Sequence, residues 1–400
     1  MAVAIDEIVV STPLRTAIGT FGGMLKDTPA TDLGATVAKA VLDRSGLAPD
    51  KIDQVIVGNV LQAGQGMNPG RQVALKAGLP PSVPGMTLNR VCGSGLQAIV
   101  SASQQVALGE SAVVLAGGIE NMDQAPFLLP KARYGYRMGM PTADLLDGMV
   151  YDGLWDIFND YHMGLTAENV AEQYGVSRDE ADAYSVRSHQ RAARATDAGA
   201  FKDQIVPVPV KQRRETVEFS TDEHVRPTTT SEALRKLPPV FKTDGSVTAG
   251  NASGINDGAA LMLVSSRGTA DRLGLPVQGR LVAYAVAGVD PALMGMGMVP
   301  ATRKALERAG LSLDEIDLFE VNEAFASVAV AVGRELGIPD EKLNPVGGAV
   351  ALGHPIGASG AVLVVKLLHE LRRRQARYGL ATLCIGGGMG IAAIFERLEA

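Results

Sequence analysis

Residues 44–53 read RSGLAPDKID and residues 308–317 read RAGLSLDEID, a match at an offset of 264 positions (308 − 44 = 264). Each segment follows a stretch rich in Ala and Leu and precedes a short apolar run, residues 54–58 or residues 318–322. This pattern predicts a helix that leads into a strand at both places. A match of this kind within one chain indicates that a supersecondary unit has been duplicated.

Two more pairs of segments match in the same order. Residues 92–95 (CGSG) correspond to residues 357–360 (GASG), and residues 112–118 (AVVLAGG) correspond to residues 381–387 (ATLCIGG). Because strands and helices alternate within each half, we expect an α/β fold with a mixed or mostly parallel sheet covered by helices. Duplication would also bring the N-termini of two equivalent helices together near a pseudo-twofold axis.

The composition is that of a globular protein without a nucleic-acid or membrane signature. The chain has 400 residues, so two or more packed domains are expected. Hydrophobic residues make up 46% and aromatic residues only 4%, and the 46 glycines favour close packing of helices on sheets. The net charge of −6 argues against a general binder of nucleic acid or membrane surfaces, although a local basic patch could hold a small anion.

The sequence favours a soluble, cytoplasmic setting. Cys92 and Cys384 lie 292 positions apart (384 − 92 = 292), so we expect no structural disulfide and a reducing compartment. The first residues lack the basic and apolar segments of a signal peptide, and no run is long and apolar enough to predict a transmembrane helix.

Residues 122–250 interrupt the repeat. This stretch contains the only tryptophan, Trp155, several methionines and irregularly spaced Pro, Asp and Gly. A helix is predicted at residues 177–197, with Ser177 as N-cap and Glu180 placed to complete a capping box. We interpret the region as an inserted lobe, where substrate contacts tend to lie.

Both cysteines lie among glycines, which let a substrate or a backbone approach closely. Cys92 lies in NRVCGSG at residues 89–95, ahead of a predicted helix at residues 96–108, and Cys384 opens CIGGGMG at residues 384–390. A helix N-terminus favours a thiolate, so Cys92 is a candidate nucleophile. The alternative is the commoner state of a free cysteine, a small buried apolar residue.

Two polar motifs are candidates for the rest of an active site. Residues 322–326 (NEAFA) follow the strand of the second repeat, at the strand end where α/β sheets bind ligands. The alternative is an Asn cap on a helix that starts at Glu323. Residues 353–360 (GHPIGASG) place His354 between Gly and Pro before a helix, which favours a general base over a structural histidine.

Three further features allow more than one interpretation. His162 is a second candidate, as a pocket residue of the inserted lobe, whereas His189 and His369 lie on predicted helices and are expected to face solvent. The small residues of 248–258 (TAGNASGINDG) would let an extended ligand lie against the backbone, although a tight loop has the same composition. Residues 201–242 contain eight Lys or Arg and six Asp or Glu, which could meet phosphates or form a solvated face.

Four motifs resemble the active-site motifs of the thiolases, and the resemblance covers essentially the whole chain. They are VCGSG at residues 91–95, NEAF at residues 322–325, GHPIGASG at residues 353–360 and CIGGGMG at residues 384–390. The resemblance implies the thiolase fold, in which duplicated βαβ-type halves form a layered α-β-α-β-α core with an inserted loop domain. The implied division is an N-terminal half of residues 1–121 and 251–273, a loop domain of residues 122–250 and a C-terminal half of residues 274–400.

The resemblance also implies a reversible Claisen condensation of two acetyl-CoA molecules to acetoacetyl-CoA and coenzyme A, by a ping-pong mechanism through an S-acetyl-cysteine. Cys92 would be the acylated nucleophile, activated by His354. Cys384 would be the acid/base at the α-carbon of the second acyl group. Asn322, through a water, would join His354 at the enolate, and the N–H groups of Cys92 and Gly386 would form the other oxyanion hole.

Within the family, YHMG at residues 161–164 resembles the short-chain, acetoacetyl-CoA-forming members. The loop at residues 133–140 would serve assembly of a homotetramer, a dimer of dimers. Met298 stands where the family's MGxGP pattern has proline, which bears on the expected pocket shape. The implied acyl-pocket and coenzyme A contacts are His162, Met163, Arg226, Ser253, Met294 and Phe325.

The sequence shows no motif for a metal, a flavin or a nicotinamide, so we expect no cofactor, and the implied partners are acetyl-CoA, acetoacetyl-CoA and coenzyme A. The nearest alternative is a broad-range 3-oxoacyl-CoA thiolase of fatty-acid β-oxidation. The presence of His162 argues against this alternative. A decarboxylating ketoacyl synthase would have a histidine in place of Cys384. A non-catalytic acyl or lipid carrier could lose Cys92 or His354, and this chain keeps both.

Overall fold

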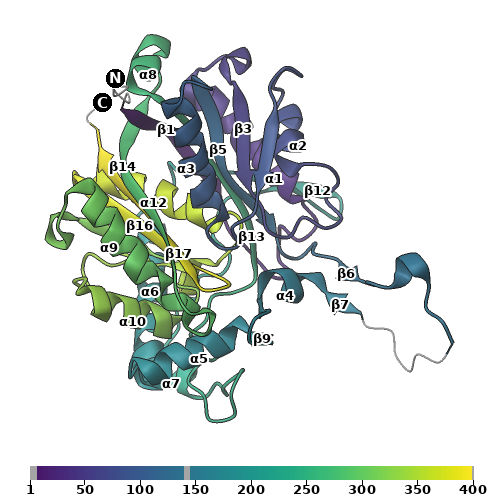
Figure 1. Cartoon of the computed structure of the whole chain (residues 1–400), viewed down its shortest axis with the longest axis vertical. Helices are drawn as coiled ribbons and strands as arrows, with labels where there is room; N and C mark the ends of the chain where they lie inside the picture. Colours follow the sequence, from purple (N-terminus) through teal and green to yellow (C-terminus); the bar gives the residue numbers. More distant parts are fainter. Residues whose placement is uncertain (1–6, 139–144, 399–400) are drawn as a thin grey trace.

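The computed structural model describes residues 7–138 and 145–398, and its two halves repeat one order of strands and helices (Figure 1). The N-terminal half consists of β1 (Ile8–Thr16), β2 (Gly19–Thr20), α1 (Ala30–Ser45), η1 (Pro49–Lys51), β3 (Gln54–Gly58), α2 (Pro69–Lys76), β4 (Gly85–Leu88), α3 (Ser94–Ala107), β5 (Val113–Asn121), β13 (Asn256–Ser266) and α8 (Arg267–Leu273). The C-terminal half consists of β14 (Val277–Gly288), η3 (Pro291–Gly297), α9 (Met298–Ala309), η4 (Leu313–Glu315), β15 (Leu318–Val321), α10 (Ala326–Leu336), α11 (Ala349–Leu352), α12 (Ser359–Arg374), β16 (Tyr378–Ile385) and β17 (Met389–Arg397).

Strand pairing shows the duplication directly. The order β3-β5-β13-β1 in the first half combines one parallel pair with antiparallel pairs, and the order β15-β16-β17-β14 in the second half repeats it. Val55 lies opposite Leu115, and Phe319, which is 264 positions after Val55 (319 − 55 = 264), lies opposite Leu380. The half-sheets join where β1 pairs antiparallel with β14. The predicted duplication and mixed sheet are therefore confirmed.

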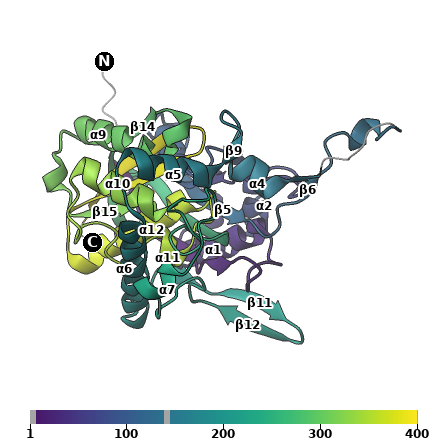
Figure 2. The same ribbon diagram turned by 90° about the horizontal axis from the view of Figure 1, so that it is seen from below.

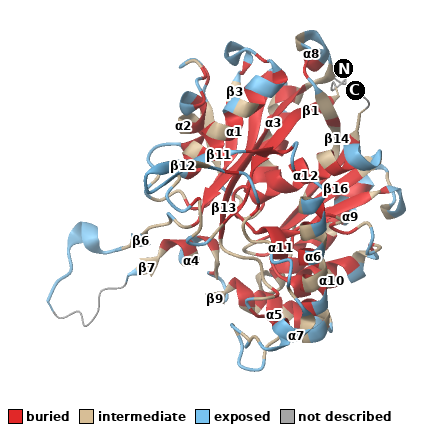
Figure 3. Cartoon of the chain, turned by 180° about the vertical axis from the view of Figure 1, so that it is seen from behind, coloured by how far each residue is buried: buried red, intermediate tan, exposed pale blue. Residues whose placement is uncertain are grey.

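Helices form three layers around the strands. α1 and α2 pack on the strands of the N-terminal half, whereas α9 packs on β14 and β17, with α10 beside it. α3 and α12 pack against each other in the middle, and each also contacts the strands of its own half (Figure 1). This is the predicted α-β-α-β-α core, and Figure 3 shows its strands and central helices as the buried part of the molecule. Within residues 7–138 and 145–398, no helix combines the length and apolar character needed to cross a membrane.

Glycines allow the two central helices to approach at backbone distance. A Cβ atom added to Gly360 of α12 would lie 2.4 Å from the main-chain nitrogen of Leu96 in α3. One added to Gly95 of α3 would lie 2.8 Å from the main-chain nitrogen of Ala361 in α12. Because backbone cannot yield as a flexible side chain can, any side chain at either position would push the helices apart. Two segments that match in the sequence repeat thus meet in space.

The inserted residues form small elements and two long helices over one end of the core. Helix α6 (Arg178–Asp197) begins with the Ser177–Glu180 capping box predicted from the sequence, and α5 (Met163–Gln173) and α6 pack on α10. Two hairpins project from the body (Figure 2): β6 (Phe127–Leu128) with β7 (Leu146–Asp147), and β11 (Val208–Gln212) with β12 (Glu215–Phe219). The elements are β6 (Phe127–Leu128), η2 (Ala132–Tyr134), β7 (Leu146–Asp147), α4 (Gly148–Gly153), β8 (Trp155–Asp156), β9 (Tyr161–His162), α5 (Met163–Gln173), α6 (Arg178–Asp197), β10 (Ile205–Val206), β11 (Val208–Gln212), β12 (Glu215–Phe219) and α7 (Ser231–Arg235).

Substitution of Gly360 by Ala is expected to force α3 and α12 apart and to destabilise the fold. The expected loss in the free energy of unfolding is about 1–3 kcal/mol, the usual cost of overpacking a core, and denaturant titration measures it. Gly333→Ala in α10 is the matched control, because its added Cβ would meet only Leu343, at 3.4 Å. This control should be neutral or stabilising by up to about 1 kcal/mol. Equal stabilities of the two variants would contradict the role of the crossing.

Candidate active site

Cys92 lies on a strained turn directly before α3. Val91 has a φ of 43°, in the left-handed region that β-branched residues rarely adopt. Asn89 Oδ1 accepts a hydrogen bond from the Val91 N–H at 2.8 Å, and Ser94 Oγ accepts one from the Arg90 N–H at 2.8 Å. These bonds hold the turn, and because α3 begins at Ser94, the cysteine lies at a helix N-terminus as predicted.

His354 is held in one tautomer. Ser359 Oγ donates its proton to the Pro355 carbonyl oxygen at 2.8 Å, so it accepts from Nδ1 of His354, 2.6 Å away. Nδ1 therefore carries the ring proton, which leaves the lone pair on Nε2. Nε2 lies 3.3 Å from Asn322 Nδ2, and the His354 main-chain N–H donates to Asn256 Oδ1 at 2.8 Å. The ring is thus arranged to accept a proton on Nε2.

Asn322 connects the histidine to the second cysteine. It is buried after the end of β15, and since α10 begins only at Ala326, it is not the N-cap of a helix starting at Glu323. Its side chain also hydrogen-bonds the sulfur of Cys384, the penultimate residue of β16. In the described part of the chain, Asn322 Oδ1 has no hydrogen-bond partner. Cys384, Asn322 and His354 therefore form one series of contacts.

One cavity of about 340 Å³ brings together most of the predicted site residues. Cys384 is fully buried, and the neighbouring Cys92 perturbs its ionisation, so the two sulfurs lie close together. Both cysteines of the sequence carry free thiols. The predicted residues that line this cavity are Cys92, His354, Gly386, His162, Met163, Ser253, Met294 and Phe325.

Burial keeps both thiols and the imidazole uncharged at neutral pH. It raises the pKa of Cys92 to about 11, although the N–H groups of Gly386 and of Cys92 itself lower it. Burial and the neighbouring Cys92 raise the pKa of Cys384 well above its ordinary value, and burial lowers the pKa of His354 to about 4. These N–H groups favour a thiolate, as expected at a helix N-terminus, but in the free protein desolvation raises the pKa of Cys92 by more than they lower it.

Arg226 lies outside this cavity, in an adjoining one of about 510 Å³. Its side chain is exposed there, beside His189 and His224. The two cavities share Ala249 and Ala252, so they adjoin each other along the small-residue segment.

Two histidines expected to face solvent do not. His189 on α6 is buried, and its Nδ1 accepts a hydrogen bond from the Arg226 N–H at 3.1 Å. His369 on α12 is half-buried, with Nε2 at 3.0 Å from the Pro13 carbonyl oxygen. Helix α6 packs on α7, α10 and α11, and α12 lies in the central layer, so both helices are covered by other elements. The expectation that histidines on these helices face solvent is therefore wrong.

Phe241 completes the wall of the main cavity beside His162 and Phe325, and it gave no signal in the sequence. Its ring stacks on His162 with centroids 4.6 Å apart and meets Phe325 edge-on at 6.4 Å. Burial lowers the pKa of His162, so this ring is neutral and packs as an aromatic wall. Phe241 lies far from both partners in the chain, so no local pattern could have revealed the stack.

Met298, which departs from the family's proline, lies away from the cavity wall. It is fully buried as the first residue of α9. Met294, four residues earlier, lines the cavity instead. The substitution therefore affects the start of a helix and not the lining of the pocket.

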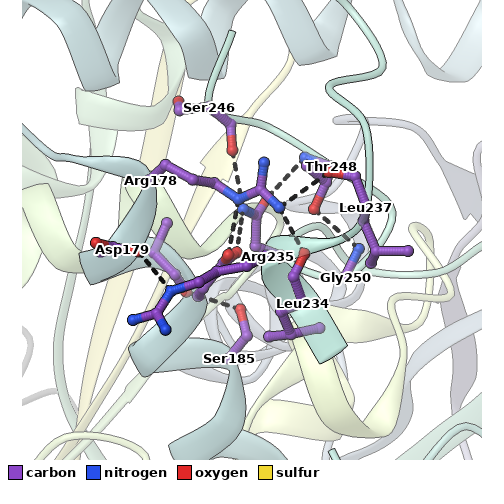
Figure 4. Close-up of polar contacts among 12 residues, drawn as sticks. Arg178, Asp179, Ser185, Leu234, Arg235, Leu237, Ser246, Thr248 and Gly250 are labelled. Atoms are coloured by element: carbon purple, nitrogen blue, oxygen red, sulfur yellow. Dashed lines mark hydrogen bonds and ion pairs between the residues drawn. The ribbon is translucent and has the colours of Figure 1, made fainter. Parts of the chain in front are cut away.

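The inserted lobe holds the small-residue segment, since Asn251 Nδ2 donates a hydrogen bond to Asp182 Oδ1 of α6 at 2.8 Å. Figure 4 shows Arg178 of α6 reaching the carbonyl oxygens of Leu234 and Leu237, at 2.6 and 3.1 Å. The Gly250 N–H donates to Thr248 Oγ1 at 3.2 Å, and Thr248 lines the main cavity. The small-residue segment is therefore held in a defined shape by hydrogen bonds.

Comparison with known proteins now defines the class. The family models for the thiolase N-terminal domain and the thiolase C-terminal domain match residues 8–268 and residues 275–397. The chain belongs to the thiolase family, and it is a thiolase acyltransferase.

Individual relatives match over almost the full length. An acetyl-CoA acetyltransferase of Syntrophomonas wolfei is 54% identical over 394 residues, covering 98% of this chain and 99% of its own. The crystal structure of the Bacillus anthracis acetyl-CoA acetyltransferase has a TM-score of 0.96 at 46% identity, covering 99% of this chain and 100% of that one. That of human mitochondrial 3-ketoacyl-CoA thiolase in complex with CoA has a TM-score of 0.94 at 44% identity, covering 98% of each chain. The predicted thiolase fold is thereby confirmed.

Alkylation of Cys92 by iodoacetamide in the absence of substrate should rise about tenfold per pH unit from about pH 7 to 9, because only the thiolate reacts. A plateau is not expected in this range, since burial raises the pKa of Cys92 to about 11. Peptide mass spectrometry of the Cys384→Ser variant, at a series of pH values, measures the rate at Cys92 alone. A rate that levels off near neutral pH would indicate a resting thiolate–imidazolium pair and would contradict the uncharged state of the two groups in the free protein.

Proposed function

We propose that this thiolase is an acetyl-CoA C-acetyltransferase, which converts two acetyl-CoA molecules reversibly into acetoacetyl-CoA and coenzyme A. The observation that carries the proposal is a single cavity lined by Cys92, His354 and Gly386 and by the short-chain motif residues His162 and Met163. The similar proteins of S. wolfei and B. anthracis are acetyl-CoA acetyltransferases, which supports the same assignment.

In the first half-reaction, the Cys92 sulfur attacks the thioester carbonyl carbon of acetyl-CoA, and the thiol proton passes to Nε2 of His354. The carbonyl oxygen becomes an oxyanion, for which the N–H groups of Cys92 and Gly386 are the available donors. The bond from carbon to the coenzyme A sulfur then breaks, and that sulfur takes the proton from His354. Coenzyme A leaves, and the acetyl group remains on Cys92.

In the second half-reaction, the Cys384 proton passes to Nε2 of His354, which creates a thiolate base and a charged donor together. The thiolate takes a proton from the methyl group of a second acetyl-CoA, while His354 and Asn322, the latter through a water, stabilise the enolate oxygen. The carbanion attacks the acetyl carbonyl carbon, so that a carbon–carbon bond forms and the bond to Cys92 breaks. The Cys92 thiolate finally takes the proton from His354, and the second proton stays on Cys384.

We propose that aromatic packing limits the acyl chain. The stack of Phe241 on His162, with Phe325 against its edge, fills the acyl side of the cavity beside Met163 and Met294. The second candidate is a 3-oxoacyl-CoA thiolase of broad chain-length range, which the similarity to human mitochondrial 3-ketoacyl-CoA thiolase favours. The two candidates share the chemistry and differ only in how much acyl chain the pocket admits.

Coenzyme A is proposed to extend from the main cavity into the adjoining one. Ser253 lines the first, Arg226 lies in the second, and Ala249 and Ala252 line both. A guanidinium is well suited to phosphate groups, which gives Arg226 its role at the nucleotide end. Since a cysteine thioester is close in energy to the substrate thioester, the proposed reaction needs no metal and no cofactor.

The homotetramer and the cytoplasmic location remain part of the proposal. Phe127, Tyr134 and Met138 on the projecting β6–β7 arm are 61%, 86% and 105% exposed, which supports an assembly surface there. Residues 139 and 140 of the predicted tetramer loop lie outside the described residues.

Cys384→Ser should still release coenzyme A once per subunit when acetyl-CoA is added, because Cys92 and His354 are unchanged. Its steady-state condensation rate should fall by about 10²- to 10⁴-fold, the usual contribution of a general acid/base. Cys92→Ser is the companion variant and should lose both activities while it stays folded. If Cys384→Ser condenses acetyl-CoA at near the wild-type rate, the assigned role of Cys384 is wrong.

Thiolysis should be much faster with acetoacetyl-CoA than with medium- and long-chain 3-oxoacyl-CoA substrates, because the aromatic stack leaves little room beyond the short acyl group. The coenzyme A-dependent cleavage rate across such a series measures the preference. Phe241→Ala should widen the range toward longer chains. A flat or long-chain profile of the wild-type protein would favour the broad-range thiolase instead.

A further inference from the structure

Two buried carboxylates beside the site take no part in the proposed chemistry. The first, Glu120, lies near the end of β5 and is fully buried. Burial raises the pKa of Glu120 to about 7, although the donors around it favour the ionised form. Glu120 accepts hydrogen bonds from Asn59 Nδ2 (2.6 Å), Val60 N (3.1 Å), Leu61 N (3.3 Å) and Gly357 N (2.9 Å).

Glu323, the residue after Asn322, is the second of these carboxylates and is 1% exposed. It too accepts four hydrogen bonds, and its donors come from α6, from the segment after α10 and from α11. They are Tyr184 Oη (2.9 Å), Ser188 Oγ (2.7 Å), Asn344 Nδ2 (2.7 Å) and Val350 N (3.1 Å).

Both carboxylates bind the segment of residues 348–357, in which His354 lies. Glu323 holds its beginning through the Val350 N–H, and Ser188 Oγ, which donates to Glu323, accepts from the Gly348 N–H at 3.1 Å. Glu120 holds its end through the Gly357 N–H. The segment is therefore fixed at both ends by main-chain bonds to buried carboxylates.

A glycine lies against each carboxylate: Gly357, whose N–H binds Glu120, and Gly348, two residues before the Val350 that binds Glu323. A Cβ added to Gly348 would lie 2.2 Å from the Glu323 carboxyl carbon, and one added to Gly357 would lie 2.6 Å from Glu120 Oε2. Each carboxylate can thus approach the main chain only because no side chain intervenes. The main chain on both sides of His354 is therefore packed closely against a buried carboxylate.

We propose that Glu120 and Glu323 are positioning residues, which fix the segment of residues 348–357 and so aim Nε2 of His354 at the Cys92 thiol. This inference rests on the proposed role of His354 as the base for Cys92. A shift of about 1 Å in a reacting group can lower the rate about a hundredfold. Fixing the segment that carries His354 at both ends is therefore expected to raise the rate at which Cys92 is acylated.

The test uses Glu120→Gln and Glu323→Gln in the full-length protein, with rapid-mixing measurement of the coenzyme A released when acetyl-CoA acylates Cys92. Glutamine keeps the size of the side chain but points an NH₂ group at donors, so at least one anchoring bond is lost. The acylation rate at saturation should fall by about 10- to 100-fold, while the half-saturating acetyl-CoA concentration stays within about threefold, because the cavity lining is unchanged.

Asp317→Asn is the matched control. Asp317 also holds main chain, because it accepts from the Arg377 and Tyr378 N–H groups at 2.8 and 3.0 Å, but it lies directly before β15, at the end of the strand opposite to Asn322. Its acylation rate per folded molecule should stay within about threefold of the wild-type rate. Equal slowing of all three variants, or wild-type acylation by Glu120→Gln and Glu323→Gln, would overturn the proposal.

His354→Ala separates failure of this inference from failure of the proposed function. If His354→Ala is inactive in acylation while the two Gln variants are normal, only the anchoring role falls. If His354→Ala acylates at the wild-type rate, the role of His354 falls and the anchoring role with it. Should a Gln variant not fold, Ser188→Ala removes the link to Gly348 together with one of the four hydrogen bonds to Glu323, and it should slow acylation by about 3- to 10-fold. A wild-type rate for Ser188→Ala would overturn the inference for Glu323.

Discussion

The crossing of α3 and α12 at Gly95 and Gly360 is the contact on which the rest of the site depends. Because neither position carries a side chain, the two backbones meet, and the turns that precede the helices deliver Cys92 and His354 to one cavity. Duplication explains how this arises, since equivalent helices of the two halves share the central layer. One half supplies the proposed nucleophile and the other supplies the proposed base, so neither half contains the site alone.

Burial within this crossing sets the charge state of the resting site. Desolvation raises the pKa of both thiols and lowers that of His354, so the free protein holds neutral groups in place of an ion pair. The Gly386 N–H already points at the Cys92 sulfur, and the His354 tautomer is fixed by Ser359. Charge would therefore develop only with substrate bound, where the donors are in position and cost little reorganisation.

Features with a local signal could be predicted from the sequence. Repeated segments predicted the duplicated layers, and glycine-rich motifs singled out Cys92 and His354 together with their partners. Contacts between distant segments could not be predicted from the sequence. Examples are the stack of Phe241 on His162 and the hydrogen bond from the Gly357 N–H to Glu120. The raised pKa of Cys92 was missed for the same reason, because desolvation is a property of the packed fold and not of the helix that follows.

The proposed mechanism depends on transfer of the acetyl group from acetyl-CoA to the Cys92 sulfur, and trapping this acetylated intermediate tests it most directly. Protein mixed with acetyl-CoA would be denatured rapidly in acid, digested and mapped by mass spectrometry for acetylated peptides. We predict a thioester-linked acetyl group on the peptide that contains Cys92, removed by added coenzyme A before quenching and absent from the Cys384 peptide. An acetyl group on Cys384, or no acetylated peptide from a sample that turns over normally, would contradict the proposed mechanism.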